Sequence, residues 1–301
     1  MRTNLITILG PTATGKTRLA AQLAQRYNGE IISADSRQVY IGMDIGTGKD
    51  LTDYFVDGEK ISYHLIDIIH PREEFNLFIF KELFAKIYLD IITRNKLPFL
   101  VGGTGLYISS IIQNYDLKKA DFNSDRIPEL EQKSQDELQN LLIKLIPKIH
   151  NTHDLSSKER MIKAILVAEA NQRLKDFPKI NSLVLGVKMN RDEIKRRITE
   201  RLRKRLDEGM VDEVKRLIES GVTFERLASF GLEYKFLSMH LKGELSYDEM
   251  FQKLNTAIHK FSKRQMTWFR KMEREGVKIN WLNGADFDAA CILIDESLST
   301  N

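Results

Sequence analysis

The stretch from Leu5 to Tyr27 constrains the fold more than any other part of this sequence. Five β-favouring residues (5–9) lead into Gly-Pro-Thr-Ala-Thr-Gly-Lys-Thr, and helix-favouring residues follow as far as Tyr27. The motif has the form G-x-x-x-x-G-K-[ST] with a strand before it and a helix after it, which is the context that a phosphate-binding loop requires. The glycines let successive backbone N–H groups point inward, and the helix N-terminus adds a partial positive charge. We therefore expect a P-loop that binds a polyphosphate group.

Seven residues are expected to form the diphosphate-binding loop, namely Gly10, Thr12, Ala13, Thr14, Gly15, Lys16 and Thr17. Lys16 would add a full positive charge beside the phosphates. The Thr17 hydroxyl is placed to hold Mg²⁺, which we expect as the cofactor. The alternative is a glycine-rich turn that carries Lys-Thr by accident, and the strand before the loop argues against it.

The composition limits the class of protein but does not indicate its function. The 301 residues fit one large or two modest domains, and 42% hydrophobic with 29% charged residues are ordinary for a globular chain. A net charge of +4 permits a nucleic-acid partner without requiring one. The single cysteine, Cys291, excludes a disulfide framework and a thiolate zinc cluster. Because the loop begins at residue 10 and no run is long enough to span a membrane, we expect a cytoplasmic protein without a membrane partner, which we also take to be a monomer.

A second short strand, residues 30–34, ends at Asp35. The carboxyl ends of parallel strands converge near the phosphate site of such a fold, so Asp35 should lie within reach of the bound group. Two structural alternatives stay open: Asp35 caps the following turn, or it holds Mg²⁺ through water. Residues 36–49 are rich in glycine and polar groups and are expected to form a long functional loop, before a candidate strand at residues 64–68.

A buried strand of the parallel type, residues 98–101, runs into a second glycine-rich turn that begins with Gly102, Gly103 and Thr104. Many nucleotide hydrolases carry a magnesium-binding aspartate where this strand ends in glycines and a threonine. Two glycine-rich turns that meet at one site suit a diphosphate bound between them. Alternatively, the two glycines only allow a tight turn.

The alternation of strands and helices weakens after Asn114 and returns with a core strand at residues 182–187. The block between them is mostly helical and charged. Residues 118–178 are therefore predicted to form a helical insertion domain, and residues 1–117 with 179–301 the catalytic core domain. The predicted fold class is α/β, a P-loop NTPase-like parallel sheet flanked by helices, with an inserted all-helical domain.

One predicted helix places Arg197, Arg201 and Arg205 at i, i+4 spacing. Like charges at this spacing cost about 0.2–0.5 kcal/mol per pair, so an anion or an acid usually meets them. Glu193 can pair with Arg197 and Glu208 with Arg205, whereas Arg201 has no acid among its helical neighbours. Arg201 is therefore the residue predicted to reach an anionic ligand, and a solvated basic face is the plain alternative.

A basic helix near the end of the chain carries cations that could meet a phosphate backbone, namely Lys260, Lys263, Arg264, Lys271 and Arg274. Its apolar stripe includes Trp268, and a tryptophan in such a stripe is more often a core residue than a platform for base stacking. We therefore expect Trp268 in the core.

Four blocks of the sequence stand in a fixed order. They are the P-loop (10–17), Asp-Ser-Arg-Gln-Val-Tyr (35–40) with Gly-Met-Asp-Ile-Gly-Thr (42–47), Gly-Gly-Thr-Gly-Leu-Tyr (102–107) and Lys-Arg-Gln-Met-Thr-Trp-Phe-Arg (263–270). Together and in this order, they resemble the tRNA dimethylallyltransferases. Many folds share the P-loop, whereas the second and third blocks together are far more specific.

The resemblance implies transfer of a dimethylallyl group from dimethylallyl diphosphate to the exocyclic N6 amine of the adenosine immediately 3′ of the anticodon, in tRNAs that read codons beginning with U. Asp35 matches the family's catalytic aspartate, Thr104 its diphosphate-contacting threonine and Arg201 its catalytic arginine. The helical insertion matches the domain that grips the tRNA. The residues expected to contact tRNA are Ser36, Gln38, Lys263, Arg264 and Gln265.

The implied reaction suits these residue types. An adenine amine is a poor nucleophile, and a carboxylate orients it and takes its proton once the new C–N bond has made it acidic. Negative charge builds on the departing diphosphate, where Lys16, Arg201 and Thr17 with Mg²⁺ would stabilise it. Extrusion of the base into a pocket is how enzymes generally reach an atom of stacked nucleic acid.

The sequence departs from the family's pattern at three places. They are Lys163-Ala164-Ile165-Leu166 in the insertion, Leu232 after Gly231, and Ile258-His259 before the Lys-Arg-Gln block. These positions bear on tRNA contact, whereas the phosphate-binding and catalytic blocks are intact.

Two other functions stay open. In a small-molecule kinase of the nucleoside-monophosphate-kinase type, the P-loop would bind ATP and Asp35 would activate an acceptor hydroxyl. The insertion and the basic helix exceed what a small acceptor requires. In an RNA-binding module the P-loop would be vestigial, which the intact Lys16, Thr17 and Thr104 disfavour.

Overall fold

The computed structural model describes residues 3–122, 124–146, 155, 157–170, 172–173 and 177–299. The chain forms two compact units, one of Met1–Asn114 with Lys179–Asn301 and one of Tyr115–Pro178. The insertion predicted at residues 118–178 begins three residues after the start of the second unit.

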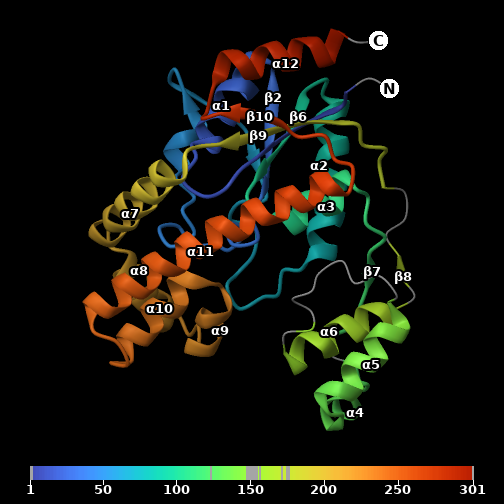
Figure 1. Ribbon diagram of the computed structural model, residues 1–301, viewed down its shortest axis with the longest axis vertical. Coiled ribbons are helices and arrows are strands. Elements are labelled where there is room, and N and C mark those ends of the chain that lie inside the picture. The colour runs from blue at the N-terminus through green and yellow to red at the C-terminus, as the bar shows by residue number, and fades with distance from the viewer. Residues whose placement is uncertain are drawn as a thin grey trace. The chain divides into compact units, whose positions relative to one another are not determined.

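A six-stranded sheet, in which every neighbouring pair is parallel, forms the centre of the larger unit (Figure 1). In spatial order its strands are β10 (Asn280–Asn283), β9 (Ser182–Lys188), β1 (Leu5–Leu9), β6 (Leu97–Gly102), β2 (Gly29–Ala34) and β5 (Tyr63–His64). Ile6 of β1 lies between Phe99 of β6 and Leu183 of β9. Strand β1 is buried along its whole length, as its near-continuous apolar sequence requires.

Helices cover both faces of this sheet. Helix α1 (Lys16–Arg26) leads from β1 to β2, and α2 (Leu77–Thr93) leads back towards β6. Right-handed crossovers therefore place these two helices on opposite faces. Helix α12 (Phe287–Ser299) packs against α1 over a shared apolar core, and α3 (Gly105–Ile112) packs against α2.

Five further helices pack around an apolar core of their own, which includes Tyr234 and Leu254. They are α7 (Arg191–Asp207), α8 (Met210–Glu219), α9 (Phe224–Ser229), α10 (Leu232–Leu241) and α11 (Tyr247–Arg274). The 28-residue α11 begins with a capping box, in which the side chains of Ser246 and Glu249 each accept from the other residue's backbone N–H. This long helix runs from the helical core to the edge of the sheet, where it packs against α3.

The segment between β2 and α2 is mostly irregular. It contains a 3₁₀ turn, η1 (Leu51–Tyr54), and an antiparallel pair, β3 (Phe55–Val56) and β4 (Glu59–Lys60). The candidate strand at residues 64–68 is wrong beyond its first residue, because Leu65 and Asp67 have φ of 63° and 54°. Left-handed residues cannot continue a strand, so the chain turns there.

The smaller unit contains α4 (Ile127–Gln132), α5 (Gln135–Leu145) and α6 (Lys158–Glu169). Their apolar faces meet in one core, made of Leu130, Leu138, Leu142, Met161, Ile162, Ile165 and Leu166. Besides these helices, the unit contains a two-residue antiparallel pair, β7 (Lys118–Lys119) with β8 (Gln172–Arg173). This pair joins the beginning of the unit to its end.

None of the helices in the described ranges is both long enough and apolar enough to span a bilayer.

Candidate active site at the P-loop

The backbone between β1 and α1 has the shape that its glycines permit. Ala13 and Gly15 are both left-handed, with φ of 65° and 79°. A Cβ on Gly10 would lie 2.8 Å from the carbonyl oxygen of Val187, so the close approach of β9 requires a glycine there. The loop thus curls tightly before the N-terminus of α1, which is the geometry of an anion-binding turn.

Two side chains brace the loop through one carbonyl. The buried Thr14 hydroxyl donates a hydrogen bond to the Pro11 oxygen at 2.9 Å, and Lys16 Nζ donates to the same oxygen at 3.4 Å. Loss of hydration, followed by the positive charge of Arg201, lowers the pKa of Lys16 to about 8, although Asp35 acts in the opposite direction. A bound anion beside Lys16 would raise this pKa again, because it favours the charged form.

Asp35 and Thr104 lie beside each other, because β2 and β6 are neighbours and both end here. The Thr104 N–H donates to the Ala34 carbonyl at 3.3 Å, and the Thr104 hydroxyl accepts from the Ser36 N–H at 3.4 Å. Asp35 Oδ1 accepts the N–H of Arg37 at 3.0 Å. Asp35 therefore does cap the turn that follows it, and it uses one carboxylate oxygen to do so.

Arg201 of α7 joins the P-loop to the long loop after β2. Its guanidinium donates to the Thr12 hydroxyl at 3.3 Å and to the Gly48 carbonyl at 3.4 Å, and it forms a salt bridge with Asp50. A glycine at position 48 makes this approach possible, because a Cβ there would lie 2.7 Å from the Arg201 guanidinium and would overlap that of Arg205. The acid that Arg201 lacks on its own helix is supplied by this loop.

Arg205 lies one helical turn further along α7 and was missed by the sequence reasoning. Its predicted partner, Glu208, instead lies 3.6 Å from Lys204. The Arg205 side chain is 11% exposed, and its Nη2 forms a salt bridge of 3.5 Å with Asp50, whereas its Nε has no hydrogen-bond partner among the described residues. Burial, followed by the charge of Arg201, lowers its pKa to about 10. The i, i+4 spacing from Arg201 was the signal for this second buried cation.

Gln265 of α11 connects the two glycine-rich turns. Its amide oxygen accepts the Thr12 N–H at 3.0 Å, and its amide nitrogen donates to the Gly103 carbonyl at 2.9 Å. The side chain is buried, and these bonds direct it into the protein. Trp268, expected in the core, is half-buried instead, and its indole N–H donates to the Ser109 hydroxyl at 2.9 Å.

Gln38 is held in the long loop that follows Asp35. Its amide oxygen accepts from the Ser33 hydroxyl at 3.1 Å, and its amide nitrogen donates to the Gly48 carbonyl at 3.1 Å. Gln38 and Arg201 therefore share one acceptor. The structure thus brings the predicted residues of the P-loop, β2, β6 and α7 together at one edge of the sheet.

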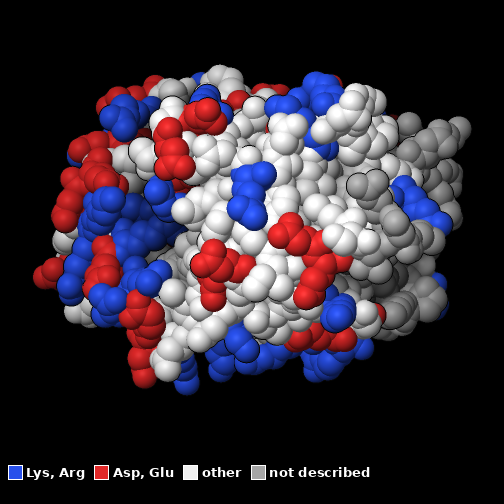
Figure 2. Space-filling model, turned by 90° about the horizontal axis from the view of Figure 1, so that it is seen from above, with Lys and Arg blue, Asp and Glu red and all other residues white. Residues whose placement is uncertain are grey.

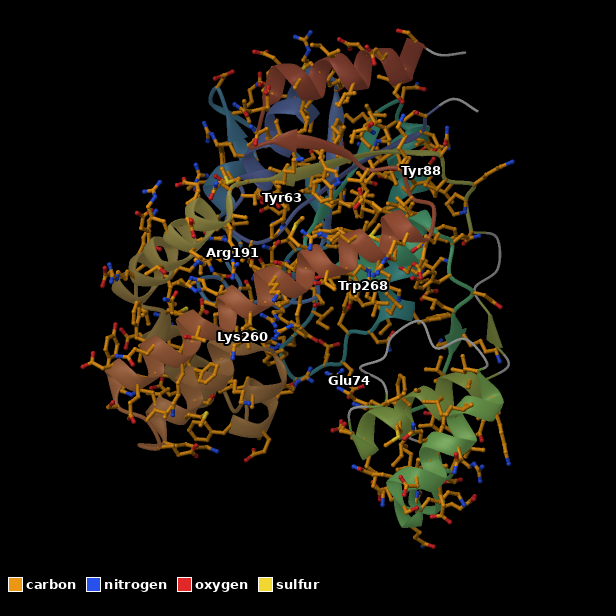
Figure 3. All side chains as sticks on the ribbon, in the orientation of Figure 1. Tyr63, Glu74, Tyr88, Arg191, Lys260 and Trp268 are labelled. Carbon is orange, nitrogen blue, oxygen red and sulfur yellow. The ribbon has the colours of Figure 1, made fainter. Side chains whose placement is uncertain are left out.

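Exposed cations lie along α11 and α7. Lys263 and Arg264 are exposed on α11, and Figure 3 shows Lys260 and Trp268 along the same helix. Seen from above, Lys and Arg side chains also gather on the side of the molecule where α7 lies, with acidic side chains around them (Figure 2). Part of this charge is neutralised locally, since Glu193 pairs with Arg197 at 2.6 Å and with Arg196 at 2.9 Å.

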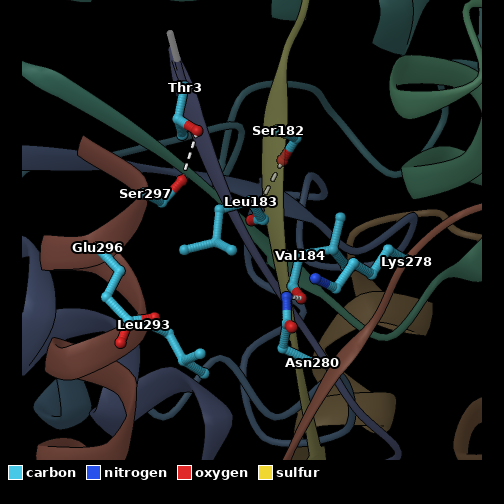
Figure 4. Close-up of a pocket in the computed structure, with 9 residues that line it drawn as sticks. All are labelled: Thr3, Ser182, Leu183, Val184, Lys278, Asn280, Leu293, Glu296 and Ser297. Atoms are coloured by element: carbon cyan, nitrogen blue, oxygen red, sulfur yellow. Dashed lines mark hydrogen bonds between the residues drawn. The ribbon is translucent and has the colours of Figure 1, made fainter. Parts of the chain in front are cut away.

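A separate pocket of about 290 Å³ lies at the amino ends of β1, β9 and β10 (Figure 4). Its lining includes Thr3, Ser182, Lys278 and Glu296. Parallel strands present their amino and carboxyl ends at opposite edges of a sheet, so this pocket lies away from the P-loop. It does not belong to the phosphate site.

The parallel sheet, the P-loop at its carboxyl edge and the partly buried cations beside that loop define a P-loop protein. A family model described as IPP transferase matches residues 38–272, and one described as isopentenyl transferase matches residues 3–66. The first match covers more than half of the sequence. The chain belongs to the IPP transferase family.

Curated relatives and solved structures agree with this assignment. The chain is 51% identical to tRNA dimethylallyltransferase 2 of Syntrophotalea carbinolica, over 95% of this chain and 96% of that protein. It is 47% identical to tRNA dimethylallyltransferase 1 of Syntrophus aciditrophicus, over 96% of each. The crystal structure of a tRNA isopentenylpyrophosphate transferase from Bacillus halodurans superposes with a TM-score of 0.71 at 33% identity, covering 99% of this chain and 97% of the other.

Proposed function

We propose that this protein transfers a dimethylallyl group from dimethylallyl diphosphate to the N6 amine of the adenosine immediately 3′ of the anticodon, in tRNAs that read codons beginning with U, and releases diphosphate. The observation that carries the proposal is the meeting of an anion-binding loop and a carboxylate, Asp35, at the edge of the sheet in a chain of this family. The 51% identical relative is named a tRNA dimethylallyltransferase. This support disfavours the small-molecule kinase.

The diphosphate is assigned to the space between the P-loop and α7. Backbone N–H groups of the P-loop and the N-terminus of α1 favour an anion there. Lys16, Arg201 and Arg205 bring cations whose charge is only partly met by Asp50. Because these groups are already in place, they stabilise the charge that develops on the leaving oxygen without costly reorganisation.

Asp35 is assigned as the acceptor of the proton. The N6 nitrogen attacks C1 of the dimethylallyl group, the bond from C1 to the diphosphate oxygen breaks, and the N6 proton passes to the Asp35 carboxylate. The hydrogen bond from the Arg37 N–H fixes one carboxylate oxygen and thereby orients the group. Thr104, beside it, is assigned to contact the diphosphate.

A magnesium ion fits this site if the substrate supplies most of its ligands. The described residues contain no group of three or more His, Cys, Asp or Glu side chains that could hold a metal. Mg²⁺ commonly keeps several waters and binds substrate phosphates with few protein ligands, so the Thr17 hydroxyl in the first turn of α1 suffices as the protein's contribution. When bound, the ion would neutralise charge on the diphosphate.

The tRNA is assigned to three parts of the chain. Lys263 and Arg264 would contact its backbone, Ser36 and Gln38 the target base, and the smaller helical unit would grip the tRNA. For Gln265, whose amide is engaged inside the protein, we assign the positioning of Thr12 and Gly103. We further propose that the enzyme works as a cytoplasmic monomer, which size-exclusion chromatography with light scattering would test for the oligomeric state.

The deciding experiment incubates the protein with radiolabelled dimethylallyl diphosphate, Mg²⁺ and unmodified tRNAs that read codons beginning with U. Label mapped to the adenosine beside the anticodon is the expected result. A tRNA with guanosine at that position is the matched control. No transfer, together with labelled ATP phosphate on a small acceptor, would establish the kinase instead.

A further inference from the structure

A buried carboxylate on α8, away from the phosphate site, accepts hydrogen bonds from the long loop that serves this site. Glu213 Oε2 accepts the N–H groups of Asp44 and Ile45 at 2.8 and 2.6 Å, and Oε1 accepts the N–H of Gly46 at 3.0 Å. Glu213 is 3% exposed and forms no salt bridge within the described residues. Its negative charge is therefore met by three consecutive backbone N–H groups, which form a small anion-binding nest.

Tyr234 completes the surroundings of this carboxylate from α10. Its hydroxyl donates to Glu213 Oε1 at 2.8 Å, and its ring is fully buried. Burial, followed by the charge of Glu213, holds the pKa of Tyr234 well above its usual value, so the hydroxyl keeps its proton. A Cβ on Gly46 would lie 2.7 Å from this ring, so the loop can reach the carboxylate only with a glycine there.

Residues 44–46, which Glu213 holds, are joined by hydrogen bonds to Gly48, whose carbonyl contacts two side chains of the active site. The N–H of Gly48 donates to the carbonyls of Asp44 and Ile45 at 3.0 and 3.1 Å, which ties the clamped turn to Gly48. The Gly48 carbonyl accepts from Gln38 at 3.1 Å and from Arg201 at 3.4 Å. A shift of the turn would therefore move the acceptor that orients both side chains.

The same turn is held from its other side by a buried cation. Lys49 is 1% exposed, and its Nζ donates to the Tyr40 carbonyl at 2.8 Å and to Asp44 at 2.7 Å, with a further salt bridge to Asp67. Buried charges of opposite sign thus fix residues 44–49 from two directions. Removal of either charge leaves buried polar groups without their partners, which is costly.

We infer that Glu213 is a positioning residue for the transfer reaction: by fixing residues 44–46, it sets the Gly48 carbonyl, and through this carbonyl Arg201 and Gln38. The inference rests on the proposed function for its effect on transfer. Its structural part concerns the loop alone and holds for whatever reaction the site performs.

The test variant is Glu213→Gln. Glutamine keeps the size of the side chain but offers only one amide oxygen, so an NH₂ group would face two of the four donors. We expect kcat for transfer to fall by about 10- to 100-fold, as small displacements of catalytic groups do. Hydrogen exchange should quicken in residues 44–49 and not in the sheet. Glu219→Gln, an exposed acid at the end of the same helix, is the matched control and should leave both quantities unchanged.

A double-mutant cycle separates positioning from general destabilisation. If Glu213 acts through Arg201, the loss caused by Glu213→Gln should be much smaller in an Arg201→Ala background. Equal losses in both backgrounds, unchanged exchange of residues 44–49, or faster exchange throughout the larger unit would each overturn the inference. Should Glu213→Gln not fold, Tyr234→Phe removes one donor from the same carboxylate and is expected to give a smaller loss with the same non-additivity.

The proposed function and this inference fail in different ways. Absence of transfer by the wild-type protein would reject the proposed function. Hydrogen exchange of residues 44–49 would still decide whether Glu213 holds the loop. Normal transfer by Glu213→Gln, with the loop released, would reject the positioning role and leave the function standing.

Discussion

Strand β2 has an acidic residue at each of its ends, and the two residues meet opposite surroundings. Glu30, near its beginning, is 3% exposed and accepts hydrogen bonds from Arg94 and Lys96 at 2.8 Å, with His64 Nε2 also at 2.8 Å. Asp35, directly after its end, caps a turn and lies in the field of the cations beside the P-loop. One sheet thus holds a buried acid among cations at one edge and an excess of cations at the other.

The difference lies in how each cluster shifts the pKa values of its members. Hydrogen bonds from Arg94 first, and then from Lys96 and His64, hold the pKa of Glu30 well below its usual range. At the carboxyl edge, burial lowers the pKa values of Lys16 and Arg205 to about 8 and about 10, although Asp50 acts on both in the opposite direction. Lowered pKa values of cations in one cluster are typical of sites that bind anions, which supports the placement of the proposed site at this edge.

The largest effect is expected from Asp35→Asn. The amide oxygen can still accept the Arg37 N–H, so the fold and its melting temperature should be preserved. The proposed proton acceptor is lost, and kcat should fall about 1,000-fold, within the usual range for a general base. Steady-state transfer kinetics beside thermal unfolding measure both quantities, and a wild-type kcat would remove Asp35 from the mechanism.

Glu30→Gln should lower the stability and leave the activity unchanged, which is the reverse of Asp35→Asn. It leaves Arg94 and Lys96 beside a neutral amide, so the free energy of unfolding should drop by about 3 kcal/mol, at the low end for a broken buried ion pair because these cations are partly hydrated. Activity of the folded fraction should not change. The exposed pair of Glu82 with Lys86 is the control, since Glu82→Gln should cost less than about 1 kcal/mol in urea unfolding.

The stability that Glu30 contributes should also depend on pH with a definite sign. Because its pKa is lowered on folding, the contribution is fully present above the unfolded value of about 4.5 and is lost as the pH falls below it. If Glu30→Gln and the wild type lost stability in parallel on acidification, the cluster would not be the source of this dependence.

The next largest effect is a pH dependence of the affinity for dimethylallyl diphosphate, which we expect to arise from Lys16. The lysine loses its charge as the pH rises through its pKa of about 8 in the ligand-free protein, so the Kd for dimethylallyl diphosphate should rise about tenfold between about pH 7 and pH 9. Isothermal titration calorimetry would measure this change. Lys16→Arg keeps its charge over this range, and its Kd should be flat; a rise of the same size in that variant would locate the titrating group elsewhere.

The smallest effect is expected outside both clusters, on α11. Lys263→Ala and Arg264→Ala should each weaken tRNA binding and reduce the slope of log Kd against log salt by about one unit. Filter binding at several salt concentrations measures the slope. Lys86→Ala, on α2, serves as the control, and a slope equal to that of wild type in the α11 variants would exclude this face from the tRNA interface.

The sequence predicted the parts of the site that depend on local pattern. The P-loop, the strand before Asp35 and the arginine helix are each encoded within a few residues, and the parallel sheet follows from the alternation of elements. Arg205, Asp50 and Glu213 were missed because their partners come from far along the chain, as in the contacts of Glu213 with residues 167–169 positions away. Periodicity describes one element, and it cannot report which loop will lie against that element.

The same limit explains the errors of detail. The strand expected at residues 64–68 has the right apolar residues, but the left-handed backbone of Leu65 and Asp67 bends the chain away. Glu208 is correctly spaced for Arg205, yet the side chain of Arg205 points into the protein, where the loop residue Asp50 meets it. In both cases, the structure differs from what the local sequence pattern favours.

The amide of Gln265 has a consequence for how the two substrates sense each other. One side chain holds both glycine-rich turns, and it follows directly after Lys263 and Arg264 on the same helix. In the proposed complex, any displacement of this helical segment by tRNA would therefore move the two turns assigned to the diphosphate. Linkage requires such an effect to be mutual: whatever factor tRNA contributes to diphosphate affinity, the diphosphate returns to tRNA affinity. Gln265 would then couple the binding of tRNA to the binding of the diphosphate.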